Sequence, residues 1–133
     1  MKIVLVHATT FVLIFGALSA TLDAQLQKGP TAPVVDLVEV VGCLANGPNN
    51  SWQLTNASEP AVTQRASTTA EAVKAAETKP LGKQRYVLLG MSHYDAPPHL
   101  GHKMAVKGLL IKDAKETRIN DASFQMASAS CAK

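Results

Sequence analysis

Residues 97–111 read PPHLGHKMAVKGLLI, and this segment restricts the fold more than any other part of the chain. Pro97 and Pro98 have no amide donors, so a paired strand begins after them, at His102. From there every second residue is apolar, with Gly108 inside the row, and lysines alternate with it. This pattern predicts a strand with one buried face and one exposed, lysine-rich face. The glycine in the buried row indicates a bend or a bulge.

A second long strand is predicted at residues 34–44, VVDLVEVVGCL, because β-branched residues dominate it. Its V-x-G-x-L spacing, centred on Gly42, is the same as the spacing around Gly108, which suggests two bent strands of one barrel. Three further segments have strand composition, namely residues 52–55, 85–90 and 118–126. The apolar anchors of the last of these, Ile119 and Phe124, are out of phase for a regular strand.

Residues 56–80 form an insertion rich in Ala, Thr, Ser and Glu. Thr68 and Glu71 have capping-box spacing, and the residues that follow favour a helix from about residue 69 to residue 77. With Val62 and Val73 as its only large aliphatic residues, the insertion is expected to pack weakly or to be partly disordered.

The expected fold class is all-β: a five-stranded OB-like barrel with a short helix inserted between strands two and three. A small β-sandwich is the alternative. The domain is expected at residues 34–133, after an extended lead-in at residues 25–33. Its predicted core consists of Val40, Leu44, Leu54, Leu88, Met104, Val106, Leu110 and Ile119.

Residues 1–24 have the pattern of a signal peptide, with Lys2 before a mostly apolar run and small residues after it. Export to the periplasm or the extracellular space is therefore expected, with no stable membrane span after cleavage. A retained membrane anchor is the alternative. In an exported chain, Cys43 and Cys131 have each other as the obvious disulfide partner. The other possibility is two separate buried thiols.

The composition and motifs argue against several functions. A formal net charge of +3 with scattered basic residues does not suggest nucleic-acid binding. Ser92 follows a predicted strand, but Tyr94 stands where a nucleophile elbow needs glycine. Glycine-rich phosphate loops and CxxC pairs are lacking in the sequence. We therefore expect neither an enzyme nor a cofactor.

The segments VEVVGCLA, WQLTNASEP, YVLLG, HLGHKMAVKGLLI and RIN-x-x-SFQ follow one another in this order. Together they resemble an uncharacterised family of small exported bacterial proteins with OB-like barrels. The resemblance covers roughly residues 38–131, and its most specific pattern runs from His99 to Leu110. It implies a fold and export, but no activity. Asp121 departs from the family pattern, which has an apolar residue at this position in the last strand.

Two functions remain from the sequence. The first is a non-catalytic, monomeric binding or interaction module of the cell envelope, with an unknown ligand or protein partner. An OB barrel binds through the face of its second and third strands and through the loops after its first and fourth strands. The candidate contacts on that surface are Trp52, Arg85, Tyr86, Lys112 and Lys115, although the parity of Trp52 with Leu54 favours a place in the core or at its rim.

The second function is metal binding by His93, Asp95, His99 and His102, which lie within ten residues of one another. Imidazole and carboxylate groups suit zinc, copper or nickel. No spacing such as HExxH fixes their geometry, and two prolines interrupt the loop. The alternative, that His99 and His102 hold the turn before the strand by hydrogen bonds, is therefore favoured.

Overall fold

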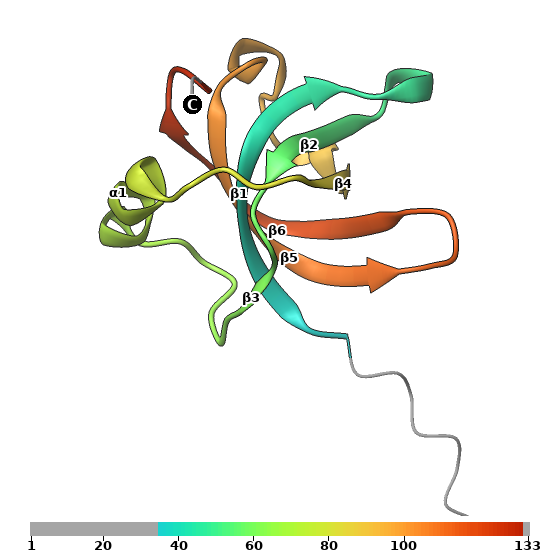
Figure 1. The fold of residues 1–133 in the computed structure, drawn as a ribbon, viewed down its shortest axis with the longest axis horizontal. Coiled ribbons are helices and arrows are strands. Elements are labelled where there is room, and N and C mark those ends of the chain that lie inside the picture. Colours follow the sequence, from blue (N-terminus) through green and yellow to red (C-terminus); the bar gives the residue numbers. More distant parts are fainter. Residues whose placement is uncertain (1–34, 132–133) are drawn as a thin grey trace, which may run out of the picture. The chain divides into compact units, whose positions relative to one another are not determined.

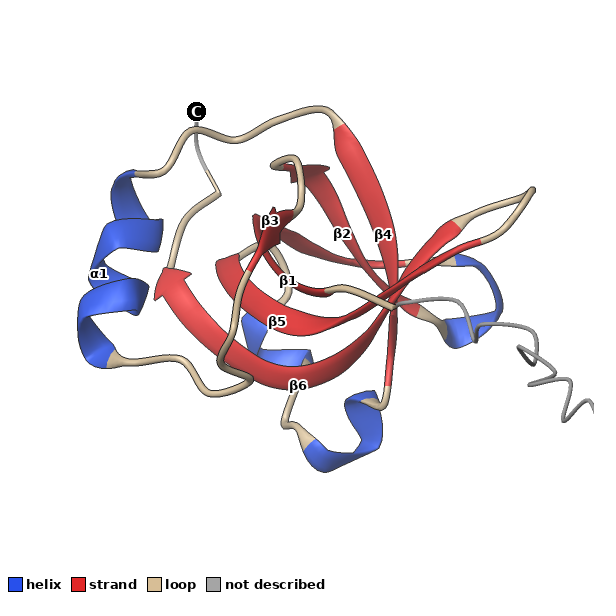
Figure 2. Ribbon diagram, turned by 90° about the horizontal axis from the view of Figure 1, so that it is seen from below, coloured by secondary structure: helices blue, strands red, loops and turns tan. Residues whose placement is uncertain are grey.

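The computed structural model describes residues 35–131. The predicted signal peptide and lead-in lie outside these residues. The described chain is mostly β: six strands form one sheet, accompanied by one short α-helix (Figures 1 and 2). The elements are β1 (Leu37–Asn46), β2 (Trp52–Ala57), β3 (Ala61–Val62), α1 (Ala70–Thr78), β4 (Gln84–Leu89), β5 (Lys103–Lys112) and β6 (Thr117–Ser128), with 3-10 turns at Pro48–Asn50, Met91–His93 and Pro97–His99.

Five of the strands close into a ring, visible in Figure 1. β1 pairs with β5 along residues 37–43 and then with β2 along residues 43–46, both antiparallel. β2 pairs with β4, and β5 pairs with β6. A short parallel pairing between β4 and β6 completes the ring. The two-residue β3, which the sequence did not predict, pairs with β1 at Val38 and Glu39.

The inside of the ring holds the main core, and the predicted core residues lie there. Seven of them are no more than 4 % exposed: Val40, Leu44, Leu54, Leu88, Met104, Val106 and Ile119. Leu110 is half-buried and packs against the same cluster. Along β1 and β5 the alternation of side chains was therefore sufficient to identify the inner face.

Truncation of Val106 tests this core. Val106 is fully buried opposite Val40, so Val106→Ala is expected to lower the free energy of unfolding by about 1 to 3 kcal/mol, through lost transfer energy and a residual cavity. Chemical denaturation measures this change. The matched control is Val62→Ala, because Val62 is 66 % exposed. An equal loss in both variants would contradict a core inside the ring.

Gly108 lies at a bulge, as the sequence predicted. A Cβ atom on Gly108 would stand 2.3 Å from the Asn120 carbonyl oxygen, so only glycine fits this close approach. The register with β6 shifts here: Lys107 pairs with Ser123 and Gly108 with Asp121, which leaves one extra residue on β6. This extra residue brings Ile119 and Phe124, which are out of phase in the sequence, into the same core.

The lysine-rich face of β5 is buried, so the prediction of an exposed face was wrong. Lys103 and Lys107 are 8 % and 6 % exposed, and Ala105 between them is fully buried. The insertion covers this face, with α1 in contact with β5 and β6 (Figure 2). Ala105, Val41 and Ala76 of α1 form a second small apolar cluster. Long lysine side chains can be buried along their stems when their ammonium groups find partners.

The N-cap of α1 is Thr69 and not Thr68, one residue later than the capping-box spacing suggested. The Thr69 hydroxyl accepts a hydrogen bond from the Ala72 amide at 3.2 Å. Thr68 instead shares a 2.8 Å hydrogen bond with the Ser123 hydroxyl of β6. Its side chain therefore attaches the insertion to the sheet.

Cys43 and Cys131 form a disulfide, as predicted. Their Cα atoms are 5.7 Å apart, and 88 positions separate them in the sequence. The bond joins β1 to the segment after β6. The helix of the described chain is too short to cross a membrane.

Candidate functional site

The candidate site is a cleft where α1 ends, which we call the lysine cleft. Its volume is about 680 Å³, within the usual range for small-molecule sites. Three parts of the chain meet there: the irregular end of β2, the C-terminus of α1 with the segment that follows, and the start of β5. Its lining consists of Asn56, Glu77, Thr78, Lys79, Pro80, Leu81, Gly82, Lys83 and Lys103.

The floor of the lysine cleft depends on two unusual backbone positions. The β2–β4 register shifts between Leu54 and Ala57, and Asn56 there has a left-handed backbone with φ of 47°. The Gly82 amide donates to the Asn56 carbonyl at 3.0 Å. A Cβ atom on Gly82 would stand 2.3 Å from the Ala57 carbonyl oxygen. This close approach requires glycine and holds the segment after α1 against β2.

Lys103 is a buried residue of the lining. Its Nζ donates to the carbonyl oxygens of Glu77, at 2.8 Å, and Lys79, at 2.6 Å. These carbonyls belong to the end of α1, where backbone acceptors lack partners within the helix. Pro80 follows and prevents the helix from continuing. Lys103 therefore attaches the C-terminus of α1 to the ring.

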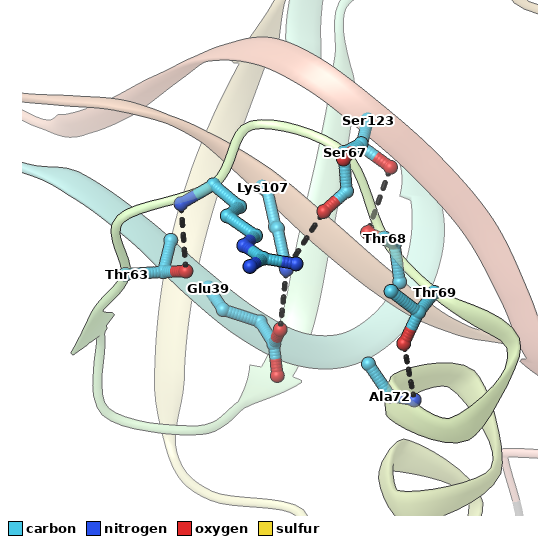
Figure 3. A network of polar contacts seen from close by, with 9 residues as sticks. Glu39, Thr63, Ser67, Thr68, Thr69, Ala72, Lys107 and Ser123 are labelled. Carbon is cyan, nitrogen blue, oxygen red and sulfur yellow. Dashed lines mark hydrogen bonds and ion pairs between the residues drawn. The ribbon is translucent and has the colours of Figure 1, made fainter.

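Lys107 attaches the other end of the insertion (Figure 3). Its Nζ lies 3.4 Å from Glu39 Oε2 and donates to the Ser67 carbonyl at 3.0 Å. Figure 3 shows these contacts beside the Thr68–Ser123 hydrogen bond and the N-cap of α1. The insertion is thus held at both ends by buried lysines of a single strand.

Removal of the Lys107 ammonium group is expected to destabilise the protein. Lys107→Met keeps most of the apolar stem but leaves Glu39 and the Ser67 carbonyl without their partner. Because the Glu39 side chain is 23 % exposed, water replaces part of the contact, and the expected loss is about 1 to 3 kcal/mol. Chemical denaturation measures this loss. The control is Lys74→Met, because Lys74 is an exposed residue of α1. A variant as stable as the wild type would show that Lys107 contributes only packing.

The five residues predicted as a binding surface do not form one surface. Tyr86 lies in the core, and its hydroxyl donates to the Ser58 carbonyl at 3.1 Å, so it cannot contact a surface ligand. Burial, with a smaller effect of Glu59, raises the pKa of Tyr86 to about 12. Trp52 is half-buried and packs against the core rim. Arg85 is exposed on β4, on the face opposite Tyr86.

The other two predicted contacts, Lys112 and Lys115, belong to the hairpin between β5 and β6. Asp113 Oδ1 accepts hydrogen bonds from the amides of Lys115 and Glu116 at 2.9 and 3.0 Å. These backbone hydrogen bonds, more than the nearby Arg118, lower the pKa of Asp113. Arg118 also forms ion pairs with Asp113, at 2.8 Å, and Glu116, at 3.7 Å. The acidic groups of this hairpin thus pair with Arg118 and with backbone amides.

Of the candidate metal ligands, His99 and His102 contact each other in the described structure. His99 Nδ1 and His102 Nδ1 lie 3.2 Å apart, so one of the two nitrogens donates to the other. The His99 ring also packs edge-on against Phe124, with centroids 6.0 Å apart. His93 and Asp95 are exposed. Within residues 35–131, no three side chains of metal-ligating types are close enough to share an ion.

We expect the His99 and His102 pair to be structural. Replacing both by Gln removes the hydrogen bond between the rings and the contact with Phe124, and should lower Tm by roughly 4 to 8 °C, which corresponds to about 1 kcal/mol. Calorimetry measures the shift, and elemental analysis of wild type and variant should show the same low metal content. About one tightly bound zinc or copper per wild-type chain, lost in the double variant, would make metal capture the leading function.

Asp121 of β6 has a buried carboxyl group. Neither carboxylate oxygen has a hydrogen-bond partner within the described residues. Removal from water raises the pKa of Asp121 to about 8. Tyr94 lies near it, and burial together with the charge of Asp121 raises the pKa of Tyr94. Asp121 lies on the ring strand beside the bulge, opposite Gly108.

Sequence reasoning did not find the lysine cleft. Its lining comes from three separate stretches around residues 56, 77–83 and 103. In the sequence, the lysines of the insertion cannot be distinguished from ordinary solvent-exposed lysines. Lys103 was assigned to an exposed face. The one local signal was Gly82 directly after Pro80 and Leu81, a pattern that also fits an ordinary turn.

Comparison with known proteins gives no assignment for this geometry. No protein family, no curated protein and no solved structure matches the chain. The function is therefore inferred from the arrangement of the chain's own residues.

Proposed function

We propose that this protein is an exported, non-catalytic binding module of the cell envelope that holds a small ligand in the lysine cleft. The observation that carries the proposal is the cleft itself: about 680 Å³, formed where the insertion docks on the ring. Concave sites of this size with a few convergent polar groups are the usual places for small ligands. The cleft is formed before the ligand binds, because Lys103 and Lys107 hold the insertion to the ring by hydrogen bonds.

The proposed fold is an OB-like barrel, as the resemblance to the family of small exported proteins implies. The closure of five strands through the β1–β2 pairing supports it. In this scheme the helix-bearing insertion between β2 and β4 is the ligand-binding addition to the barrel. The register shift at Asn56 and the close approach of Gly82 to β2 are then the features that shape the lysine cleft.

Export is supported by two features of different kinds. The first residues have the composition of a signal peptide. The Cys43–Cys131 disulfide is of the kind that forms and persists in oxidising compartments. We therefore assign the protein to the periplasm or the extracellular space.

Native mass spectrometry of the protein purified from its envelope fraction tests this function. Thr78 is exposed and lines the cleft, so Thr78→Trp should fill it without disturbing the ring. We expect wild-type protein to carry a small ligand and Thr78→Trp to lose it. Lys74→Trp, on α1 but outside the lining, is the matched control and should keep the ligand. Equal occupancy of Thr78→Trp and wild type, or no bound ligand in any of the three proteins, would refute the proposal.

A further inference from the structure

The two buried lysines of β5 have different partners. Lys107 has a carboxylate, that of Glu39, at 3.4 Å. Lys103 is equally buried, yet both acceptors of its Nζ are neutral backbone carbonyls. None of the ion pairs within residues 35–131 includes Lys103. Among the described residues, Lys103 is thus a buried ammonium group with no negative side chain in ion-pair contact.

This difference matters because of the free energy of burying a charge. A charged group taken out of water is destabilised by several kcal/mol unless an opposite charge and hydrogen bonds compensate for it. The carbonyls at the end of α1 provide about half a negative charge in total. They also occupy two of the three N–H donors of the ammonium group. Part of the charge, and one donor, remain for a further partner.

The surroundings of Lys103 favour a partner from outside the chain. Lys103 lines the lysine cleft, and so do Lys79 and Lys83, against a single acid, Glu77. Three lysines against one acid give the lining a net positive charge, and low-dielectric walls concentrate the field of such charges. Lysines bind phosphate and carboxylate groups well as point charges.

We propose that the lysine cleft binds a small organic anion whose carboxylate or phosphate group supplies the negative charge facing Lys103, with Lys79 and Lys83 at the rim. The cleft is much larger than one phosphate group, so it has room for an organic part, and Pro80 and Leu81 offer that part an apolar wall. This inference rests on the proposed function and adds the chemical class of the ligand.

Isothermal titration calorimetry at constant ionic strength tests the proposal, with inorganic phosphate and succinate as separate probes. We expect saturable binding of at least one of them with a Kd below about 1 mM. Lys79→Gln with Lys83→Gln should weaken that binding at least about tenfold. Arg65→Gln with Lys74→Gln removes the same charge from exposed positions outside the lining and should leave Kd within about twofold. The probe that binds identifies the anionic group.

Other outcomes would overturn the proposal. The absence of saturable heat for both probes up to about 10 mM would do so, as would equal weakening by the cleft pair and the control pair. Loss of binding in Lys112→Gln with Lys115→Gln, but not in the cleft pair, would move the anion to the hairpin. Lys103→Gln should also weaken binding, and if it does not fold, the cleft pair still decides.

The failure of this inference is distinguishable from the failure of the proposed function. If the co-purified ligand is neutral or cationic and is absent from Thr78→Trp, the binding function stands and the anionic class of the ligand is rejected. A wild-type protein that carries no co-purified ligand and binds neither phosphate nor succinate would reject both the proposed function and this inference.

Discussion

Asp121→Asn is expected to raise the free energy of unfolding at pH 8 and to remove most of its decline between pH 4 and pH 8. The folded protein holds this carboxyl protonated up to a pKa of about 8, because burial disfavours the charged form. The unfolded chain releases the proton near pH 4. The stability associated with the protonated carboxyl is therefore fully present below about pH 4 and is lost as the pH rises through about 8.

The size of this effect follows from the same two pKa values. Each pH unit between them removes about 1.4 kcal/mol, so the upper bound over the whole window is on the order of 5 kcal/mol. Asparagine has nearly the same shape and no charge, so the variant should match the wild type at pH 4 and exceed it at pH 8. Urea denaturation across this pH range measures the difference. Asp36→Asn carries the same change at an exposed side chain and serves as control. A wild-type curve as flat as that of Asp121→Asn would refute the burial of a protonated carboxyl.

Reduction of the Cys43–Cys131 disulfide is expected to lower the free energy of unfolding by about 4 to 5 kcal/mol. The bond closes a loop of 88 positions, and the entropy that it removes from the unfolded chain gives this magnitude. A domain of this size has on the order of 5 to 15 kcal/mol in total. Tm should therefore fall by roughly 20 °C or more in the reduced protein.

The comparison needs three samples: oxidised wild type, wild type with a reducing agent, and Cys43→Ala with Cys131→Ala. The reduced wild type and the double variant should unfold at similar temperatures, well below the oxidised protein. The double variant should not respond to the reducing agent, which controls for other effects of that reagent. Two reactive thiols in the unreduced, denatured wild type would contradict the disulfide itself.

Local signals in the sequence were enough to locate the five strands of the ring, although not their pairing. Apolar residues at every second position identified the inner face of β1 and β5, and Gly108 indicated the bulge. The turn at Pro48–Asn50 is likewise local, since Asn49 and Asn50 adopt the left-handed backbone that asparagine tolerates. These features depend on residues that are neighbours in one strand or turn, so the sequence alone is enough to predict them.

The outer layer could not be predicted in the same way. Alternation assigns Lys103 and Lys107 to a face but does not tell what covers that face. Their partners are backbone carbonyls and a glutamate many positions away. An insertion with few large apolar residues was therefore expected to pack weakly or to be partly disordered, although hydrogen bonds and the small Ala76 hold it to the sheet. Histidines close in sequence similarly gave no information on whether their side chains converge.

The parallel pairing of β4 with β6 also has a consequence for association between copies of the chain. It comprises only three register pairs, at Val87, Leu88 and Leu89, whereas β5 and β6 pair along nearly their whole length. A fluctuation that separates this short seam would leave an open sheet with two unpaired edges. Each edge is complementary to the other edge of a second, identical chain, so strand-exchanged dimers would arise by opening at this point. We therefore expect heat and high protein concentration to produce strand-exchanged aggregates through opening of the β4–β6 pairing, and a longer pairing of these two strands to suppress them.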